Sequence, residues 1–408
     1  MMKDGEGNKS PRSRRGRRPM INGILALFIV VFLISSLHIV RYSSLETLSQ
    51  NPAESSLPCL RTVPARQQHQ QVPFSYKASN IEQYVHNNAI ELQLNSSTGQ
   101  RDSGCHWILG KKDNQNEVSQ SPPPPPAGNH SATIRSFMQE IEEYARLDAA
   151  FSSNVTDLRR KIARDGNHQV CATLRLHADG LPGLFASDVL SHATTFGLIE
   201  PLVPPLRHPG ICSDHDRYLM NTNYILHDYE ALCRKLKPTS KIVFIDMGAA
   251  LDFHGKRKSP AVTEVERFTR FGFPFDHIYA FEKKPKNTAA VFLEQLPADW
   301  LSTYHWINEG VSAEVGHKMN PYHMLESAFS VDDFVVMKLD IDTPAIELPL
   351  ARQLLAQYYP LVDVFYFEHH VKLQELREWG RGVAGSILDS LELFRDLREK
   401  GVAAHSWV

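Results

Sequence analysis

The sequence is poor in cysteine, with only five in 408 residues. A fold of this length that depended on disulfide bonds would need many more, so a disulfide-based scaffold is excluded. No CxxC pair and no cysteine/histidine cluster with zinc spacing occurs, so the sequence predicts no structural zinc site. The pairing of the cysteines stays open; they are Cys59, Cys105, Cys171, Cys212 and Cys233.

The chain also lacks an excess of positive charge, because its formal net charge is −2. Proteins that bind nucleic acid through its phosphate backbone carry a strongly basic surface. We therefore expect no nucleic-acid partner. The basic residues that gather in 1–19 need another explanation, and the segment that follows them supplies it.

Residues 20–40 form a long apolar run that contains no Asp, Glu, Lys or Arg. About 20 residues at a rise of 1.5 Å cross a hydrocarbon core roughly 30 Å thick. The basic tail before the run favours a cytosolic N-terminus. We therefore predict a signal anchor, a single-pass type II membrane protein, and a C-terminal part in the lumen of the Golgi or endoplasmic reticulum. A cleaved signal peptide is the alternative.

The polar segment 41–130, with a proline run at 122–126, buries too little apolar surface to offset its ordering entropy. We expect a flexible lumenal stem there; a small folded module around Cys105 and Trp107 is the alternative. Glycosylation sequons fit an exposed lumenal segment; they begin at Asn95, Asn129 and Asn154. Residues 131–238 are predicted to form a mainly helical extension, with helical periodicity at 134–162 and 218–236 and a short strand at 168–176.

Strand-like and helix-like segments alternate from about residue 239 to the C-terminus. Such alternation is typical of βαβ units, so we predict an α/β fold with a doubly wound, mostly parallel, Rossmann-like sheet over 239–408. The expected strands are 242–246, 277–282, 303–308, 334–340, 362–368 and a short final one at 402–407. The expected helices are 260–271, 286–296, 344–358 and 386–399.

Five of these strands end in a polar or acidic residue. The carboxyl ends of parallel strands meet at one edge of the sheet, where ligands of such folds bind. The residues expected along that edge are Asp246, Glu282, Asn308, Asp340 and Glu368. After the first strand, Gly248 and Ala249 make a tight, low-walled turn that a ligand could approach closely.

The order and spacing of DMGAA, FEKKP, INEGVS, VVMKLDID and FYFEHH resemble the FkbM-like class of S-adenosylmethionine-dependent methyltransferases over about 241–408. The resemblance implies a class I methyltransferase-type fold that holds S-adenosylmethionine. It implies that the methionine part of the cofactor lies by Asp246, Gly248 and Ala249, the ribose by Glu282, and the adenine by Asn308 or Glu309. Asp340 would face the cofactor and the acceptor. The chain departs from the family pattern in its long basic loop before Ser259 and in its single strand after the fifth, so an incomplete terminal hairpin is expected.

Elementary chemistry supports these roles. A carboxylate accepts two vicinal hydroxyl hydrogens, so Glu282 suits a ribose without a metal. Acids along the edge would stabilise the cationic sulfonium of the cofactor. Methyl transfer to an oxygen gains from alignment and from a base, for which we name Asp340 and His369 as catalytic candidates, with His370 as an alternative base. The predicted compartment favours a glycan or small metabolite as the acceptor.

Two rival functions remain open. A type II anchor with a stem is also the architecture of Golgi glycosyltransferases, in which the two acids of a DxD such as Asp340-Ile341-Asp342 hold Mn²⁺. Alternatively, the domain is a scaffold that keeps the fold without catalysis. The mark of such a scaffold is an edge whose acids are covered by 131–238 or paired with Arg and Lys. The sequence specifies neither the acceptor nor the oligomeric state.

Overall fold

The computed structural model describes residues 80–89, 235–253, 257–284, 296–371 and 385–407, together with residue 287 and isolated positions in 132–139 and 222–232. These residues belong to one compact unit, 70–408. Within them, no helix has both the length and the apolar character needed to cross a membrane. The tail 1–19 and the span predicted at 20–40 lie outside the described residues, so the signal anchor stays a prediction.

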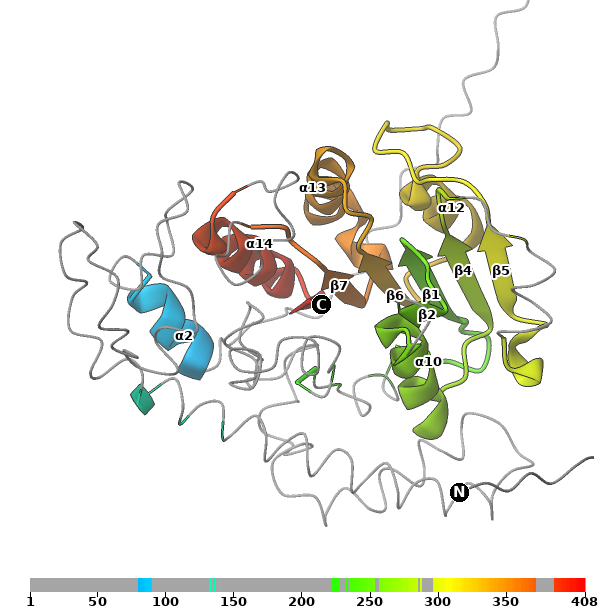
Figure 1. Cartoon of the computed structure of the whole chain (residues 1–408), viewed down its shortest axis with the longest axis horizontal. Coiled ribbons are helices and arrows are strands. Elements are labelled where there is room, and N and C mark those ends of the chain that lie inside the picture. Colours follow the sequence, from blue (N-terminus) through cyan, green and yellow to red (C-terminus); the bar gives the residue numbers. More distant parts are fainter. Residues whose placement is uncertain are drawn as a thin grey trace, which may run out of the picture. The chain divides into compact units, whose positions relative to one another are not determined.

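The centre of the fold is a six-stranded sheet in the order β5-β4-β1-β6-β7-β8 (Figure 1). Every neighbouring pair in it is parallel. The strands are β1 (Ile242–Met247), β4 (His277–Phe281), β5 (Tyr304–Ile307), β6 (Phe334–Leu339), β7 (Val364–Phe367) and β8 (Ala403–Ser406). All residues of β1 and β6 are buried, which explains why they are mostly apolar. The predicted α/β fold with a parallel sheet is confirmed.

Among the described residues, four helices flank the sheet: α10 (Pro260–Arg270), α12 (Pro321–Ala328), α13 (Pro344–Gln353) and α14 (Ile387–Glu399). Three begin with proline, whose fixed φ suits the first turn and whose missing N–H is not needed there. The fourth, α14, begins with a capping box in which Ser386 and Asp389 bond each other's backbone N–H. α13 continues into a π-helical turn, Leu354–Tyr358, and a short 3-10 turn, Tyr359–Leu361.

The helices cover both faces of the sheet. On β7, Phe367 packs against Phe394 of α14, whereas the next residue back, Tyr366, contacts His227, which packs on Phe268 of α10. Because successive strand residues point to opposite faces, α14 and α10 lie on opposite sides. On α12, Tyr322 stacks on Tyr358 just beyond α13 and donates to the carbonyl oxygen of Leu350 at 2.8 Å. The sheet is therefore doubly wound.

The segment before the sheet departs from the helix predicted over 218–236. Leu232 and Lys235 are helical, but the described positions between 222 and 227 are not. The guanidinium of Arg267 in α10 donates to the carbonyl oxygens of Thr222 and Ile225, which an α-helix would bond to its own amides. Tertiary contacts with α10 thus replace helical hydrogen bonds in this segment.

His227 is buried where this segment meets α10. Its Nε2 lies 3.0 Å from Glu264 Oε2 and 3.3 Å from the hydroxyl of Tyr366. Burial lowers the pKa of His227 to about 4, although the neighbouring Glu264 carboxylate opposes the shift. Arg267 completes the cluster 3.2 Å from Glu264. The neutral His227, through Tyr366 of β7 and the Glu264–Arg267 ion pair of α10, therefore holds this segment against the sheet and α10.

Some elements were not predicted. The basic loop after β1 contains a small antiparallel pair, β2 (Asp252–Phe253) and β3 (Arg257–Lys258). Helix α2 (Asn80–Asn87) lies within the predicted stem, and Val85 is buried in the core cluster. The rest of 41–130 lies outside the described residues, as do the strand predicted at 168–176 and most of the helices predicted at 134–162 and 286–296.

Candidate functional site

The order in which successive strands join the sheet reverses between β1 and β6, while all strands stay parallel. From β1 the chain adds β4 and β5 on one side, and then β6, β7 and β8 on the other (Figure 1). Ligands of open parallel sheets bind outside the carboxyl ends of the strands at such a switch point. Asp246 pairs in register with Lys338, so the ends of β1 and β6 lie directly beside each other at this edge.

The turn after β1 is packed tightly against the chain that follows β6. Gly248 has φ 85°, a left-handed conformation, and a Cβ at this position would lie 1.6 Å from the carbonyl oxygen of Asp340. The N–H groups of Gly248 and Ala249 both donate to the carbonyl oxygen of Phe281, at 3.0 and 2.9 Å. Gly248 therefore makes room for the protein's own backbone, whereas the sequence predicts room for a ligand at this turn.

Lys338 occupies the centre of the switch point. Its Nζ lies 3.0 Å from Asp246 Oδ1, 3.1 Å from Asp340 Oδ2 and 2.9 Å from the carbonyl oxygen of Gly248. Burial alone would lower the pKa of Lys338, but Asp246 and then Asp340 raise it above its usual range, so the amine is charged. For the carboxyl group of Asp246 the effects are opposite in sign: burial raises its pKa, and the charge on Lys338 opposes that shift. Lys338 therefore already forms ion pairs with two of the predicted site acids, Asp246 and Asp340.

Sequence reasoning missed Lys338, although a signal was present. A lysine inside an otherwise apolar, fully buried strand needs a charged partner. Asp340 stands two residues after it, and Asp246 ends the strand that the topology places alongside. Within the motif VVMKLDID, the resemblance to the methyltransferases gives this lysine no role of its own.

The remaining predicted cofactor residues follow β4 and β5. Glu282 is partly exposed, and its Oε1 accepts the backbone N–H of Lys284 at 2.6 Å. Its negative charge is one of the smaller causes that raise the pKa of Asp246, after burial and Asp340, so it acts on the end of β1. Asn308 is exposed and accepts a hydrogen bond from Trp306 Nε1 at 2.8 Å; Glu309 is exposed beside it. The structure thus brings the predicted residues to one edge of the sheet.

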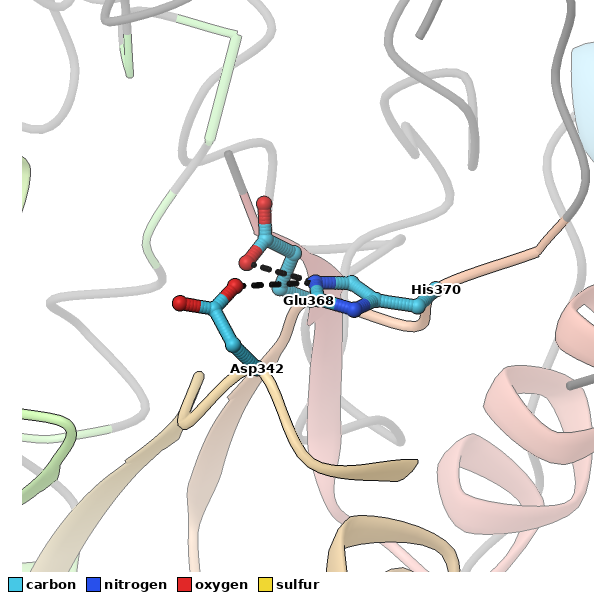
Figure 2. A group of neighbouring side chains, drawn as sticks. All are labelled: Asp342, Glu368 and His370. Atoms are coloured by element: carbon cyan, nitrogen blue, oxygen red, sulfur yellow. Dashed lines mark hydrogen bonds and ion pairs between the residues drawn. The ribbon is translucent and has the colours of Figure 1, made fainter. Parts of the chain in front are cut away.

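A second group of side chains lies at the ends of β6 and β7. His370 Nε2 is 3.0 Å from Glu368 Oε2 and 3.7 Å from Asp342 Oδ1, and Figure 2 shows both carboxylates turned toward the imidazole ring. Glu368 and His370 are buried, whereas the Asp342 side chain is 86% exposed. The described residues therefore contain a mixed histidine and carboxylate cluster beside the switch point.

Acidic side chains gather around this cluster. Burial, and then the neighbouring Asp340 carboxyl group, raise the pKa of Glu368 well above its usual range. Burial also raises the pKa of Glu347 in α13 to about 7, although this carboxylate accepts the N–H of Ile341 at 2.8 Å. Glu347 was missed because it lies within a helix and not at the end of a strand.

The two histidines after β7 have different surroundings. The ring of His369 stacks on Phe367 at 5.2 Å, and its charge is one of the smaller causes that lower the pKa of Asp389 in α14, after the hydrogen bonds from Ser386. The structure therefore places His369 towards α14, and it brings His370, the alternative base, to the acidic cluster. Of the two histidines named as candidate bases, it is therefore His370, and not His369, that lies beside the carboxylates of Asp342 and Glu368.

The described residues fit S-adenosylmethionine unevenly. Glu282 fits best, because its carboxylate is partly exposed on the edge beside the β1 turn. Asp246 fits less well as a partner for a cationic cofactor, since Lys338 already pairs with it. Comparison with protein-family models, with curated proteins and with solved structures found no match to this chain.

Proposed function

We propose that residues 239–408 form a class I methyltransferase-like domain that binds S-adenosylmethionine and methylates an oxygen of a glycan or small metabolite. The observation that carries the proposal is the position of Glu282. It follows β4, the strand next to β1, at the carboxyl edge of a doubly wound parallel sheet. A carboxylate in that place suits the paired hydroxyls of a nucleoside.

The cofactor supplies an electrophilic methyl group on a cationic sulfur. Glu282 would accept hydrogen bonds from its ribose, and Asn308 and Glu309 would lie near the adenine. The carboxyl groups of Asp340, Asp342, Glu347 and Glu368 gather at this edge, and a positively charged ligand would favour their ionised forms. The acids beside the switch point therefore support binding of a cation, even though Asp246 is paired.

Asp340 is the proposed base for the acceptor hydroxyl. Its side chain is 22% exposed, and Lys338 holds one carboxylate oxygen at 3.1 Å, which fixes its orientation. The predicted signal anchor would place this domain in the secretory pathway, where such acceptors occur.

The binding role of Glu282 is tested by replacing it. Glu282→Ala should weaken binding of labelled S-adenosylmethionine to the full-length protein by roughly 1–3 kcal/mol, or about 5- to 150-fold in Kd, since polar groups lose a partner. Equilibrium dialysis measures this change. Glu314→Ala, at an exposed position after β5, is the matched control and should leave the affinity unchanged. Equal affinities of the Glu282→Ala variant and the unmodified protein would remove the main support for the proposal.

The ion pairs of Lys338 favour a second candidate, a scaffold that keeps the fold without catalysis. Pairing of the edge acids with a lysine is the feature expected of such a protein, and Asp246 and Asp340 show it. Incubation with methyl-labelled cofactor and a glycan extract separates the two: labelled product supports the enzyme, and bound cofactor without product supports the scaffold. The glycosyltransferase alternative gains less, because the two acids of the DxD have different partners, Lys338 for Asp340 and His370 for Asp342.

A further inference from the structure

We propose that Asp342, Glu368 and His370 form a binding site for a divalent transition-metal ion. The inference goes beyond the proposed methyltransferase function and does not depend on it. The three side chains stand on the loops that follow β6 and β7, and Asp342 is also the second acid of the DxD named above.

The spacing of the three side chains is close to that of ligands around one ion. One donor atom from each residue lies within 4.8 Å of the other two, and His370 Nε2 lies 3.0 Å from Glu368 Oε2. Two donors bound at about 2.1 Å from a common ion lie roughly 3.0–3.4 Å apart in octahedral or tetrahedral geometry. The separation of 3.7 Å between His370 Nε2 and Asp342 Oδ1 requires only a small movement. Asp342 is the exposed member and has room to make it (Figure 2).

Two of the three donors are held in place by the fold. Glu368 follows β7 directly, and its N–H donates to the carbonyl oxygen of Leu339 at the end of β6. His370 is buried, and the turn around it is closed by a hydrogen bond from Val371 N–H to the carbonyl oxygen of His369. Donors fixed on rigid elements lose little entropy when they bind an ion. The third donor, Asp342, would close over the ion from the β6 loop.

The charge around the cluster also favours a cation. Two further carboxyl groups lie beside the cluster: Asp340 stands two residues before Asp342, and Glu347 accepts the N–H of Ile341, the residue between them, at 2.8 Å. Lys338 contacts Asp340, and its other side-chain partners are Asp246 and a backbone carbonyl. A buried carboxylate such as Glu368 is costly unless it is paired, protonated or bound to a metal. A divalent ion would satisfy it together with Asp342.

The donor set indicates the class of ion. One imidazole nitrogen with two carboxylate oxygens suits Mn²⁺, Fe²⁺ or Zn²⁺, whereas Mg²⁺ and Ca²⁺ prefer an all-oxygen set. Three protein ligands leave at least one coordination position for water or for an oxygen of a bound molecule. The site is therefore of the open type, and its ligand class is an oxygen-donor molecule such as a hydroxyl compound or a carboxylate.

Titration with Mn²⁺ tests the site directly. Full-length protein in detergent, stripped with a chelator, is titrated while electron paramagnetic resonance follows the free ion, and Zn²⁺ competition follows. We expect one saturable site per chain. Asp342→Asn and His370→Gln should each weaken it by about tenfold or more. Glu326→Gln, on an exposed position of α12, should leave the affinity unchanged.

Asp342→Asn carries the test because its side chain is exposed, so the variant should fold; circular dichroism checks this. Binding of neither Mn²⁺ nor Zn²⁺ to the unmodified protein would overturn the proposal, as would an unchanged affinity in Asp342→Asn. The readout contains no S-adenosylmethionine. A failure of metal binding is thus distinguishable from a failure of cofactor binding, which is measured on Glu282.

Discussion

Replacing Gly248 by alanine should disrupt the switch point more than the same replacement at Gly310, Gly316 or Gly385. The new Cβ would lie 1.6 Å from the carbonyl oxygen of Asp340 and 2.7 Å from its carbonyl carbon. Both are backbone atoms, so no side chain can rotate away to relieve the contact. The loop after β6 must move as a whole, and the contacts of Lys338 with Gly248 and Asp340 must change with it.

The cost can be separated into two parts. A non-glycine residue at the left-handed φ of 85° costs about 1–2 kcal/mol. Overpacking against fixed backbone adds about 1–3 kcal/mol, for a total of roughly 2–5 kcal/mol. Gly316 is the matched control, because its φ is 81° and a Cβ there would have no neighbour within 4 Å. Gly316→Ala should therefore show only the conformational part.

Thermal unfolding of the full-length protein, followed by far-ultraviolet circular dichroism, measures the difference. At about 2–4 °C per kcal/mol for a domain of this size, Gly248→Ala should lower Tm by roughly 4–20 °C. Gly316→Ala should lower it by only about 2–8 °C. Equal decreases in the two variants would refute the reasoning, because the clash with Asp340 would then contribute nothing.

Two other predictions concern buried charges. Lys338→Met should destabilise the protein to urea by about 3–5 kcal/mol by leaving Asp246 without its partner, and adding Asp246→Asn should recover part of the loss; no recovery would contradict the ion-pair account. Stability should also fall as pH drops from 6.5 toward 4. In this range His227 binds a proton in the unfolded chain but not in the folded protein, where its pKa beside Glu264 and Arg267 is about 4. The loss approaches about 3 kcal/mol, and urea unfolding of His227→Gln should show a flatter pH profile. An unaltered profile in that variant would assign the dependence to other groups.

The sheet could be predicted because buried parallel strands are mostly apolar, as are 242–247 and 334–339 apart from Asp246 and Lys338. The edge residues Asp246, Glu282 and Asp340 could be predicted for the same reason, since each stands where such a run ends. The ion pairs that Asp246 and Asp340 form could not be predicted. The ion pairs of Lys338 depend on the register of β1 against β6, and register is a property of the assembled sheet.

Other differences have equally local causes. Helix α12 has only eight residues, and its signals are the cap Asn320 and the proline that follows it, not a long amphipathic pattern. Residues 222–227 have helical periodicity, yet Arg267 takes the carbonyl groups that a helix would use. His369 and His370 are adjacent in sequence, and no periodicity shows which of them meets Glu368. The proposed metal site depends on that last detail, so the sequence could not predict it; only Asp342 had a metal role, in the DxD of the glycosyltransferase alternative.

Calorimetric titration of the full-length protein with S-adenosylmethionine tests the central claim most directly, namely that the carboxyl edge between β4 and β6 holds a nucleoside cofactor. The account predicts one saturable site per chain that is weakened by Glu282→Ala and retained in Glu314→Ala. No saturable heat in the unmodified protein, or equal affinity in both variants, would contradict it.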